Sequence, residues 1–509
     1  MIITDELFRI ALAKLFRSGI PAKVAVALSG GPDSMLLAWL LRNQKRRNNN
    51  LDIYAITIDH KYRPESHREA WRVHEWVKGW DINHIVKALE YKDNLDPSTM
   101  NNFEEVARDE RYKVMSEICS RESIPALFMG HHRDDQLETF IQRLQGNSSI
   151  FGLAGTRSIS PLPVARDLSP AESPAQGRLQ LQIARPFWEF DKADILETCE
   201  ASGIPYVTDP TNKDASLTRR NYLRYLIGEV IPNMCATLHT DGSTDGIDLT
   251  SPYSSIQRSE LIKLHASCHE FATLFEDKAQ RLSQYLHSHD LVKEYPHLGS
   301  LELTLPRPCF QETDCMVTSR FLYRILHLYS TLKHYHWAYA KLERQLVPRI
   351  AQFLEQHKPG TLKITMMNLV FEVTNNDQLD LIPMKIYRCP IVTKNAGAIE
   401  KQLSLGVEWS EWELFDSRFW IRARSRTSPK QIRIIPYLHK IHKPMVEELL
   451  LAAFRPNAKY NTLPVFLEED TQKIIAFPTL SIGLPDIGLE YEWSLKSNRF
   501  AYCEQPSTV

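Results

Sequence analysis

The residue types best suited to chemistry lie in one short loop near the N-terminus, Ser29-Gly30-Gly31-Pro32-Asp33-Ser34. An apolar run typical of a buried parallel strand precedes the loop, and a helix follows it. Two glycines let backbone amides approach an anion, and the start of a helix adds N–H groups and a favourable dipole. The loop has no Walker lysine, so transfer of a γ-phosphoryl group by that machinery is not expected. The sequence predicts a polyphosphate cradle, with Asp33 as a ligand for bridging Mg²⁺. A glycine-rich turn capped by Ser34 is the structural alternative.

A second segment, Gly130 to Thr139, carries His131, His132, Asp134 and Asp135 at the junction of a predicted strand and helix. Imidazoles transfer protons near neutral pH, and carboxylates bind Mg²⁺ beside phosphate. A transition-metal site and a solvated helix start are the alternatives. The spacing favours a cluster of acid–base and Mg²⁺-binding groups at the end of one strand.

Hydrophobic patterning predicts strands that alternate with helices through the first 145 residues. The strands are expected at 24–28, 51–59, 81–88 and 126–129, and the helices at 34–41, 63–79, 103–121 and 134–144. This alternation predicts an α/β fold with a doubly wound parallel sheet, whose strand-end loops lie at one edge.

Three domains are expected along the chain. They are a catalytic domain over 1–235 with a Pro- and Ser-rich surface insertion at 155–182, a mainly helical region over 256–356, and a small mixed α/β domain over 361–509. In the second, a helix over Trp337 to Leu354 is expected to kink or break at Pro348.

Composition narrows the class of protein. The formal net charge is −1, so any RNA-binding surface must come from local clusters of Lys and Arg. The eight cysteines include no C-x-x-C pair, which argues against a zinc ribbon and a disulfide framework. No run of about 18 apolar residues occurs, so no membrane association is expected. Met1 to Ile20 is amphipathic but carries Asp5 and Glu6, which favours an ordinary first helix over a transit peptide.

One local basic cluster stands out near the C-terminus. Between Arg418 and Lys443 the chain has eight Lys and Arg residues and no Asp or Glu. Arg422, Arg424 and Arg426 alternate in a strand-like segment, so they share one face. With Phe419, Trp420 and Tyr437 nearby, this stripe could bind RNA phosphates and stack on bases. A solvated face is the alternative.

The loop resembles that of the PP-loop ATP pyrophosphatase superfamily, S-G-G-x-D-S. Further segments resemble tRNA(Ile)-lysidine synthase across about residues 22–232. They are Asp59 to Ser66, Glu104 to Tyr112, Gly130 to Thr139 (G-H-H-x-D-D-x-x-E-T), Arg185-Pro186-Phe187, Asp209 to Asn212 and Arg220 to Arg224, with a looser match over Lys440 to Glu469. In the first of these, Lys61-Tyr62 replaces the family's usual Gly-Leu.

The resemblance implies ligation of L-lysine to C2 of the wobble cytidine in the isoleucine tRNA with a CAU anticodon. ATP would adenylate the base and Mg²⁺ would assist. The implied ATP-binding residues are Ser29, Gly30, Gly31, Pro32, Asp33 and Ser34. The implied catalytic residues are Asp33, His131, His132, Asp134 and Asp135, with Asp33 and Asp134 on Mg²⁺. The expected substrate- and tRNA-binding residues are His60, Arg63, Glu104, Arg108, Arg111, Arg185, Asp209, Asn212, Arg220, Arg224, Arg422 and Arg424.

Two rival functions stay open. A tRNA thiolase shares the loop but requires a reactive cysteine or an iron–sulfur cluster, and no cysteine is expected near the strand ends. A non-catalytic tRNA-binding protein would not need the loop. The additions to the compact bacterial pattern favour a eukaryotic relative and hence the mitochondrion, with the cytoplasm as the alternative.

Overall fold

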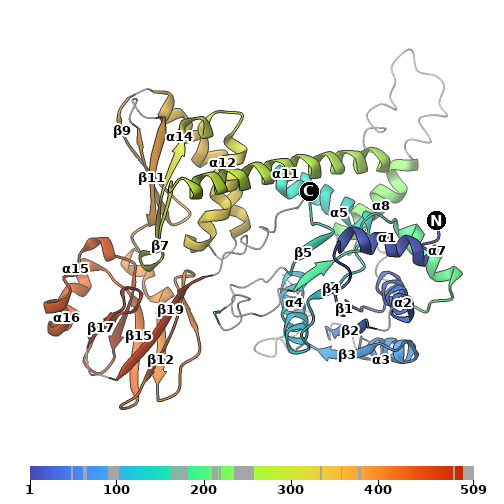
Figure 1. Ribbon diagram of the computed structural model, residues 1–509, viewed down its shortest axis with the longest axis horizontal. Coiled ribbons are helices and arrows are strands. Elements are labelled where there is room, and N and C mark those ends of the chain that lie inside the picture. The colour runs from blue at the N-terminus through green and yellow to red at the C-terminus, as the bar shows by residue number, and fades with distance from the viewer. Residues whose placement is uncertain are drawn as a thin grey trace. The chain divides into compact units, whose positions relative to one another are not determined.

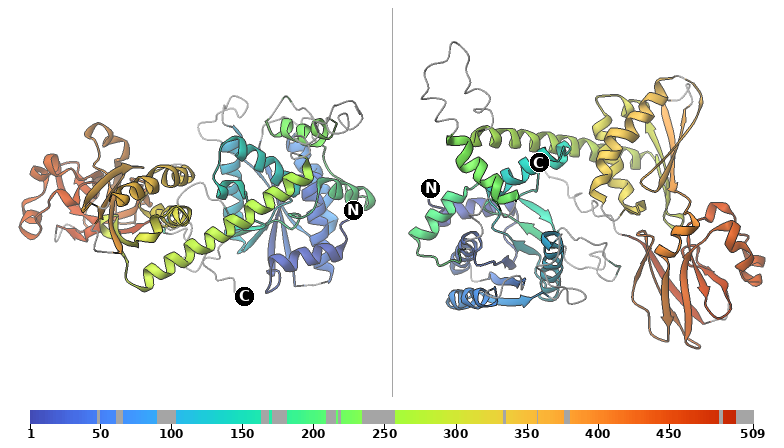
Figure 2. Two further views of the ribbon diagram at one scale, coloured as in Figure 1. Left: turned by 90° about the horizontal axis from the view of Figure 1, so that it is seen from above. Right: turned by 180° about the vertical axis from the view of Figure 1, so that it is seen from behind.

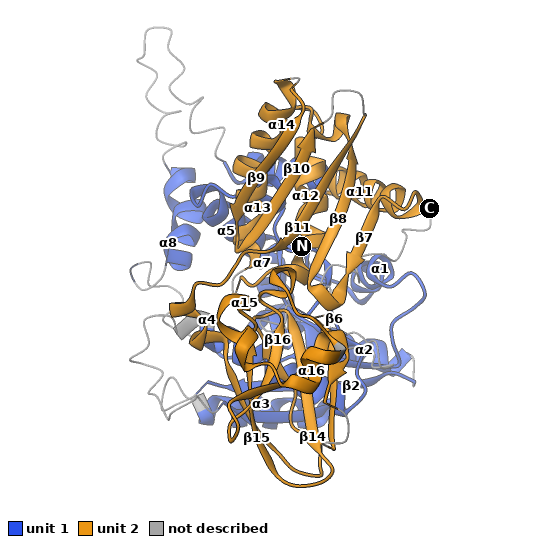
Figure 3. Ribbon diagram, turned by 90° about the vertical axis from the view of Figure 1, so that its left-hand side faces the viewer, with its two compact units in different colours: residues 1–165, 177–272 blue, residues 166–176, 273–509 orange. Residues whose placement is uncertain are grey.

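The computed structural model describes residues 1–47, 50–60, 66–89, 103–162, 169–170, 181–208, 216, 219–233, 257–332, 335–356, 358–375, 380–484 and 488–496. The chain forms two compact units (Figure 3). The first comprises residues 1–165 and 177–272, and the second comprises residues 166–176 and 273–509.

A six-stranded sheet forms the centre of the first unit, in the order β3-β2-β1-β4-β6-β5 (Figure 1). The first five strands are parallel, and β5 pairs antiparallel with β6. The bounds are β1 Lys23–Ala27, β2 Asp52–Asp59, β3 Asn83–Ala88, β4 Ala126–Phe128, β5 Ile159–Pro161 and β6 Gln182–Ala184. The predicted parallel α/β sheet is confirmed. Part of the predicted insertion, β5, instead forms the sheet's edge strand.

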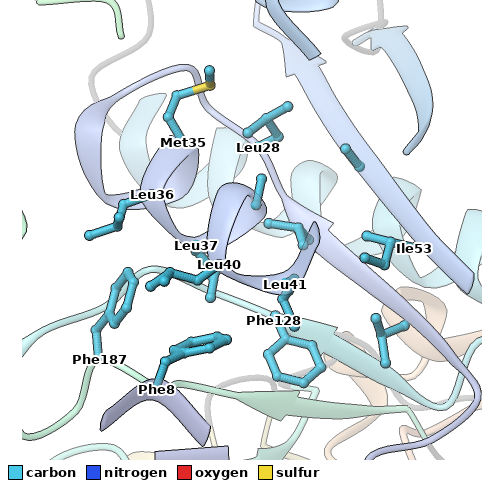
Figure 4. Packing of buried hydrophobic residues seen from close by; sticks show 14 of the residues in the cluster. Phe8, Leu28, Met35, Leu36, Leu37, Leu40, Leu41, Ile53, Phe128 and Phe187 are labelled. Atoms are coloured by element: carbon cyan, nitrogen blue, oxygen red, sulfur yellow. The ribbon is translucent and has the colours of Figure 1, made fainter. Parts of the chain in front are cut away.

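Helices cover both faces of this sheet, as a doubly wound fold requires (Figure 1). Residues of α1, α2, α3 and α7 pack on one face, and residues of α4 pack on the other. On the first face, Phe8 of α1 lies against Phe187 beside the leucines of α2 (Figure 4). The bounds are α1 Asp5–Leu15, α2 Pro32–Arg47, α3 Ser66–Val77, α4 Phe103–Arg121, α5 Arg133–Gln145, α6 Ile150–Leu153, α7 Lys192–Ala201 and α8 Arg219–Tyr225.

Helix α2 is longer than its apolar pattern predicts. It continues past Leu41 to Arg47 and ends in Lys45, Arg46 and Arg47. Basic residues in a last turn interact favourably with the helix dipole, so this polar segment extends the helix instead of ending it.

Helix α11 (Arg258–Ser288) is a single long helix that begins in the first unit (Figures 1 and 2). Its first half packs through Leu261 and Cys268 on Leu137 and Phe140 of α5. The first residue of α11, Arg258, thereby lies beside α5.

The second unit contains three antiparallel sheets, in the orders β7-β8-β11-β10-β9, β12-β15-β16-β17-β18 and β13-β14-β19. Its strands are β7 Val292–Tyr295, β8 Ser300–Pro306, β9 Gly360–Met366, β10 Leu369–Asn375, β11 Leu381–Arg388, β12 Lys401–Leu405, β13 Glu413–Phe415, β14 Phe419–Ser425, β15 Lys430–Pro436, β16 Pro464–Glu468, β17 Lys473–Phe477, β18 Ile482–Gly483 and β19 Leu489–Leu495. Its helices after α11 are α12 Cys315–Ile325, α13 Ala338–Lys341, α14 Val347–Glu355, α15 His439–His442 and α16 Glu448–Ala453.

Two strands in the region predicted to be mainly helical, β7 and β8, belong to the same sheet as β9, β10 and β11. The predicted division near residue 356 therefore separates strands that hydrogen bond to one another. The predicted helix break at Pro348 is replaced by a change of helix type. A π-helical turn, Leu342–Leu346, leads into α14, where Pro348 occupies the first turn and needs no N–H donor. No helix of the described residues is long and apolar enough to cross a membrane.

Candidate active site

The glycine-rich loop lies between β1 and α2, and its two serines hold its shape. The Ser34 hydroxyl accepts a hydrogen bond from the Ser29 amide at 3.1 Å and donates one to the Gly31 carbonyl at 3.1 Å. The Ser29 and Ser34 hydroxyls also lie 3.1 Å apart. Pro32 is the first residue of α2, a position where a missing N–H costs nothing. The loop is therefore held in one conformation by its own side chains.

Two positions, Gly30 and Gly130, have no room for a side chain. Gly30 has a φ of +84°, and a Cβ at this position would lie 2.6 Å from Val73 Cγ2. A Cβ on Gly130 would lie 2.9 Å from both the carbonyl carbon and the Cβ of Asp33. The backbone at the end of β4 therefore passes directly against the loop, which brings the two predicted segments together.

The carboxylates predicted to bind Mg²⁺ are each paired with a cation. Asp33 Oδ1 lies 2.5 Å from Lys192 Nζ, and Asp134 Oδ1 lies 3.0 Å from Arg258 Nη2. The backbone amide of Lys192 also donates to Asp134 Oδ2 at 2.8 Å. Lys192, the first residue of α7, thus contacts both carboxylates.

A third acid, Asp191, lies beside them. Its carboxylate lies 2.8 Å from Arg258 Nη2 and 2.7 Å from Arg133 Nη1. Burial opposes ionisation of Asp191, but hydrogen bonds from Arg258 and the charge of Arg133 outweigh it and lower the pKa. Three cationic side chains, Lys192, Arg258 and Arg133, therefore surround the cluster of acids.

His132 occupies the centre of the acidic cluster and is almost fully buried. Its Nε2 lies 3.7 Å from Asp33 Oδ1 and 3.4 Å from Asp135 Oδ2, and its Nδ1 lies 3.6 Å from Asp134 Oδ2. Burial opposes ionisation of Asp135, but the nearby His132 and Arg220 lower the pKa of that carboxyl. The four predicted residues Asp33, His132, Asp134 and Asp135 therefore converge.

His131 has a different environment. Burial lowers the pKa of His131 to about 4, and the charges of Arg185 and Arg220 contribute to the shift. Arg185 Nε donates to His131 Nδ1 at 3.3 Å, and Arg185 Nη1 donates to the Arg157 carbonyl at 2.7 Å and to Ser160 Oγ at 3.0 Å. Arg185 is only 3% exposed, so its position suits orientation of His131 better than the predicted contact with tRNA.

Arg220 and Arg224 of α8 pair with acids of α5, although their side chains are 50% and 44% exposed. Arg220 pairs with Asp135 and with Glu138, and Arg224 Nε donates to Glu138 Oε1 at 2.8 Å. Glu138 is 2% exposed and lies one helical turn after Asp134 and Asp135 on α5. Of the two roles considered for these arginines, salt bridging is the one that the structure displays.

Helix α4 carries Arg108 and Arg111, which lie 5.5 and 5.6 Å from the ring centre of Tyr112. Burial lowers the pKa of His60, at the end of β2, to about 4, and the charge of Arg111 adds to the shift. The side chain of Glu104 and all of Arg63, Asp209 and Asn212 lie outside the described residues.

The donor set fits Mg²⁺ only in part. Among the described residues, no group of three or more His, Cys, Asp and Glu side chains is arranged to hold a metal by itself. Mg²⁺ is commonly bound through one or two carboxylates together with substrate phosphates. Asp33 and Asp134, both partly exposed, suit such a shared site.

The basic stripe lies in the second unit and is compensated across the sheet. Arg422 Nη2 lies 2.6 Å from Glu492, and Arg424 Nη2 lies 2.7 Å from Glu490, both on β19. Arg426 pairs with Glu490 as well.

The aromatic residues expected to stack on RNA, Phe419, Trp420 and Tyr437, are buried, and so is Arg418, which pairs with Asp416. Instead, Arg422 stacks on Trp409 and Trp412 at 4.7 and 4.8 Å. A role for Arg422 and Arg424 in tRNA binding stays a prediction, and it would require tRNA to displace Glu492 and Glu490 from these arginines.

Four residues of the first unit's site were not selected from the sequence. The sequence places Glu138 on one helix face with Asp134 but indicates no role for it, and sequence reasoning missed Asp191, Lys192 and Arg258. Asp191 and Lys192 follow β6 and begin α7, so their place at the end of a parallel strand was a usable signal. For Arg258 the sequence offers no local signal.

One expectation about cysteine is wrong. Cys199 of α7 lies beside the loop, where its thiol donates to the Pro32 carbonyl at 3.6 Å. Burial raises the pKa of Cys199 to about 12, and the nearby Asp33 contributes to the shift. The cysteine next to the loop is therefore a protonated, unreactive thiol.

Comparison with known proteins identifies the relatives of this chain. Residues 4–233 match the family model described as PP-loop domain. A probable tRNA(Ile)-lysidine synthase of Schizosaccharomyces pombe is 23% identical over 474 residues, which is 91% of this chain and 92% of the relative. A tRNA(Ile)-lysidine synthase of Bradyrhizobium is 34% identical over 197 residues, 38% of this chain.

The bacterial match spans about half of the relative, 49% of its length. A solved U34-tRNA thiolase from Methanococcus maripaludis is 18% identical and covers 52% of this chain and 78% of its own, with a TM-score of 0.36, too low to support an argument. The matched PP-loop domain and the relative aligned along nearly the whole chain agree with the site's geometry. Residues 4–233 thus match a PP-loop domain, and along nearly its whole length the chain is similar to a probable tRNA(Ile)-lysidine synthase.

Proposed function

We propose that this chain uses ATP to ligate lysine to C2 of the wobble cytidine in the isoleucine tRNA that has a CAU anticodon. The observation that carries the proposal is the convergence of Asp33, His132, Asp134 and Asp135 beside the glycine-rich loop. It is supported by the names of the relatives from Schizosaccharomyces pombe and Bradyrhizobium, a probable tRNA(Ile)-lysidine synthase and a tRNA(Ile)-lysidine synthase.

In the first step the cytosine O2 attacks the α-phosphorus of ATP, and the bond between the α-phosphorus and the bridging oxygen breaks. Pyrophosphate leaves with the electron pair. The loop at Ser29 to Ser34 and the start of α2 hold the leaving group, because backbone amides oriented before the reaction stabilise charge that develops on it. Mg²⁺ held by Asp33 and Asp134 would neutralise phosphate charge.

In the second step the ε-amine of lysine attacks C2 of the adenylated cytosine, and AMP leaves. The attacking ammonium must lose a proton. His132 is the better proton acceptor of the two histidines on geometric grounds, since carboxylates surround it. His131 has a pKa of about 4 and accepts a hydrogen bond from Arg185 at Nδ1, so it is a weak base at neutral pH.

The rival thiolase activity requires a reactive cysteine. Cys199 beside the loop and Cys119 in α4 are buried, and burial raises the pKa of each to about 12. A thiol of this kind is a poor nucleophile at neutral pH. The described part of the site therefore favours a nitrogen nucleophile supplied by the substrate.

The test is a lysidine assay with purified protein, ATP, labelled lysine and isoleucine tRNA bearing the CAU anticodon. Wild type should incorporate lysine, and Asp33→Ala should not. A chain that incorporates no lysine, or that loses nothing in Asp33→Ala, would contradict the proposal. Transfer of sulfur to the same tRNA would favour the thiolase, and tRNA binding without either reaction would favour a binding protein.

The cellular compartment is a separate proposal. We propose the mitochondrion, where lysidine would support organellar translation. Fractionation of cells that express the tagged full-length chain tests it, and recovery in the cytosolic fraction alone would contradict it.

A further inference from the structure

The glycine-rich loop offers no cationic side chain to a bound polyphosphate. Residues 29–34 contain no Lys or Arg, and their one charged side chain is the carboxylate of Asp33. A triphosphate approaching this loop meets partial positive charge from backbone amides and a full negative charge from Asp33. Besides Mg²⁺, a cationic side chain from another part of the chain would help to offset the charge of the leaving pyrophosphate.

Lys192 is placed to supply that cation. Its Nζ lies 2.5 Å from Asp33 Oδ1, although 159 residues separate the two in the sequence. The Lys192 side chain is 35% exposed and that of Asp33 is 28% exposed, so the pair is accessible to a ligand. Asp33 has one other ionic partner among the described residues, His132 at 3.7 Å.

The backbone of Lys192 is fixed while its side chain is not enclosed. Lys192 is the first residue of α7, and its backbone amide donates a hydrogen bond to Asp134 Oδ2 at 2.8 Å. The preceding residue, Asp191, caps the helix, and its own backbone amide donates a hydrogen bond to Asp194 Oδ2 at 3.0 Å. Ile195 and Cys199 pack α7 into the core beneath α2. A lysine held in this way can move its ammonium by rotation of the side chain alone.

We propose that Lys192 is a phosphate-binding residue of this site, which rests on the proposed ATP chemistry. In the absence of nucleotide its ammonium neutralises Asp33. When nucleotide binds, Asp33 turns to Mg²⁺ and Lys192 pairs with an oxygen of the β- or γ-phosphate. As the bond to the α-phosphorus breaks, this ion pair stabilises the departing pyrophosphate and no proton needs to move. Lys192 thus provides, from the end of β6, the cation that a Walker loop carries within itself.

A purely structural ion pair would behave differently. Partly exposed pairs contribute little to folding stability, so loss of Lys192 should leave the melting temperature nearly unchanged under either interpretation. Anion affinity distinguishes a phosphate-binding Lys192 from a purely structural ion pair, provided that it is measured without the Asp33 carboxylate. Removing Lys192 alone would expose the Asp33 carboxylate to the ligand and weaken binding indirectly.

The experiment is therefore a double-mutant cycle on the full chain, with inorganic pyrophosphate as the ligand and calorimetry as the measurement. In the Asp33→Asn background, Lys192→Met should weaken pyrophosphate binding by about 10- to 100-fold, as expected for loss of a charge-assisted hydrogen bond. Lys192→Arg should recover most of that loss. An affinity within twofold of the Asp33→Asn parent would overturn the proposal.

Lys14→Met is the matched control. Lys14 makes an ion pair of the same 2.5 Å length with Glu189, but on an exposed surface of the first unit. Its removal should leave pyrophosphate affinity unchanged. If Lys192→Met melts at a much lower temperature than its parent, Lys192→Gln replaces it, and its pyrophosphate affinity is compared with that of the Asp33→Asn parent in the same way.

The lysidine assay on wild type separates failure of this inference from failure of the proposed function. Pyrophosphate binding requires neither tRNA nor lysine, so loss of binding in the cycle supports a phosphate-binding Lys192 even if another substrate is modified. If wild type forms lysidine but Lys192→Met leaves the pyrophosphate affinity of the Asp33→Asn parent unchanged, only the role proposed for Lys192 is refuted.

Discussion

The contact between Gly130 and the glycine-rich loop gives a sharp steric prediction. In Gly130→Ala, the new methyl group would lie 2.9 Å from both the carbonyl carbon and the Cβ of Asp33, and 3.0 Å from its carbonyl oxygen. Ordinary carbon contacts are about 3.5–4.0 Å, so either the end of β4 or the loop must move by about half an ångström or more. Two of the three nearest atoms belong to the loop backbone, which cannot rotate away as a side chain could.

The cost can be estimated from the packing. Forcing an extra methyl into a well-packed site costs about 1–3 kcal/mol. If the native structure absorbs the strain, the melting temperature of a unit of this size falls by about 2–4 °C for each kcal/mol. If the loop shifts instead, the same free energy appears as weaker ATP binding, about 5- to 150-fold.

The assay is ATP-dependent pyrophosphate release, with thermal melting measured in parallel. Gly79→Ala is the control, since a Cβ at that position meets no atom within 4 Å. A Gly130→Ala variant that matches Gly79→Ala in both melting temperature and KM for ATP would refute the predicted clash. A change in only one of the two would show where the strain is relieved.

Three further predictions concern buried and paired charges. Glu138→Ala removes the partner of two arginines and should lower the free energy of unfolding by about 1–3 kcal/mol in urea titrations. Glu6→Ala breaks an exposed pair and should leave the free energy of unfolding nearly unchanged, so equal losses in the two variants would be inconsistent with a central Glu138. His131 stays neutral in the folded chain until the pH approaches its pKa of about 4, whereas in the unfolded chain it takes up a proton as the pH falls below 6.5. The stability that this histidine contributes is therefore complete above pH 6.5 and declines as the pH falls. Between pH 7 and pH 5, the free energy of unfolding of wild type should fall by roughly 1–2 kcal/mol more than that of His131→Asn. Arg422→Gln should reduce tRNA affinity by less than about threefold in filter binding, because Glu492 already neutralises the guanidinium; a tenfold loss would mean that tRNA displaces the glutamate.

The features that the sequence could predict depend either on residues close together in the chain or on the topology of the parallel sheet. The strand, loop and helix around Gly30 and Gly31 follow from an apolar run, two glycines and a helix start, all within a few residues. The parallel sheet placed the ends of β1 and β4 together, so the meeting of Asp33 with His132 was predictable in outline.

The ion-pair partners were not predictable. Lys192 lies 159 residues after Asp33, and Arg258 lies 124 residues after Asp134. Likewise, the carboxylates that face the arginines of β14 come from β19, which pairs with it across nearly 70 residues. Local sequence specifies which charges are present, whereas only the packing of distant elements specifies which of them meet.

The buried thiol of Cys199 has a practical consequence. It is fully enclosed beneath the loop and donates to the Pro32 carbonyl, so a maleimide or an oxidant reaches it only when α7 and the loop separate. The rate at which Cys199 is alkylated therefore reports how often α7 and the loop separate, and no label has to be introduced into the chain. Nucleotide that tightens the loop should slow the labelling, and the chain contains its own probe of motion at the centre where ATP is proposed to bind.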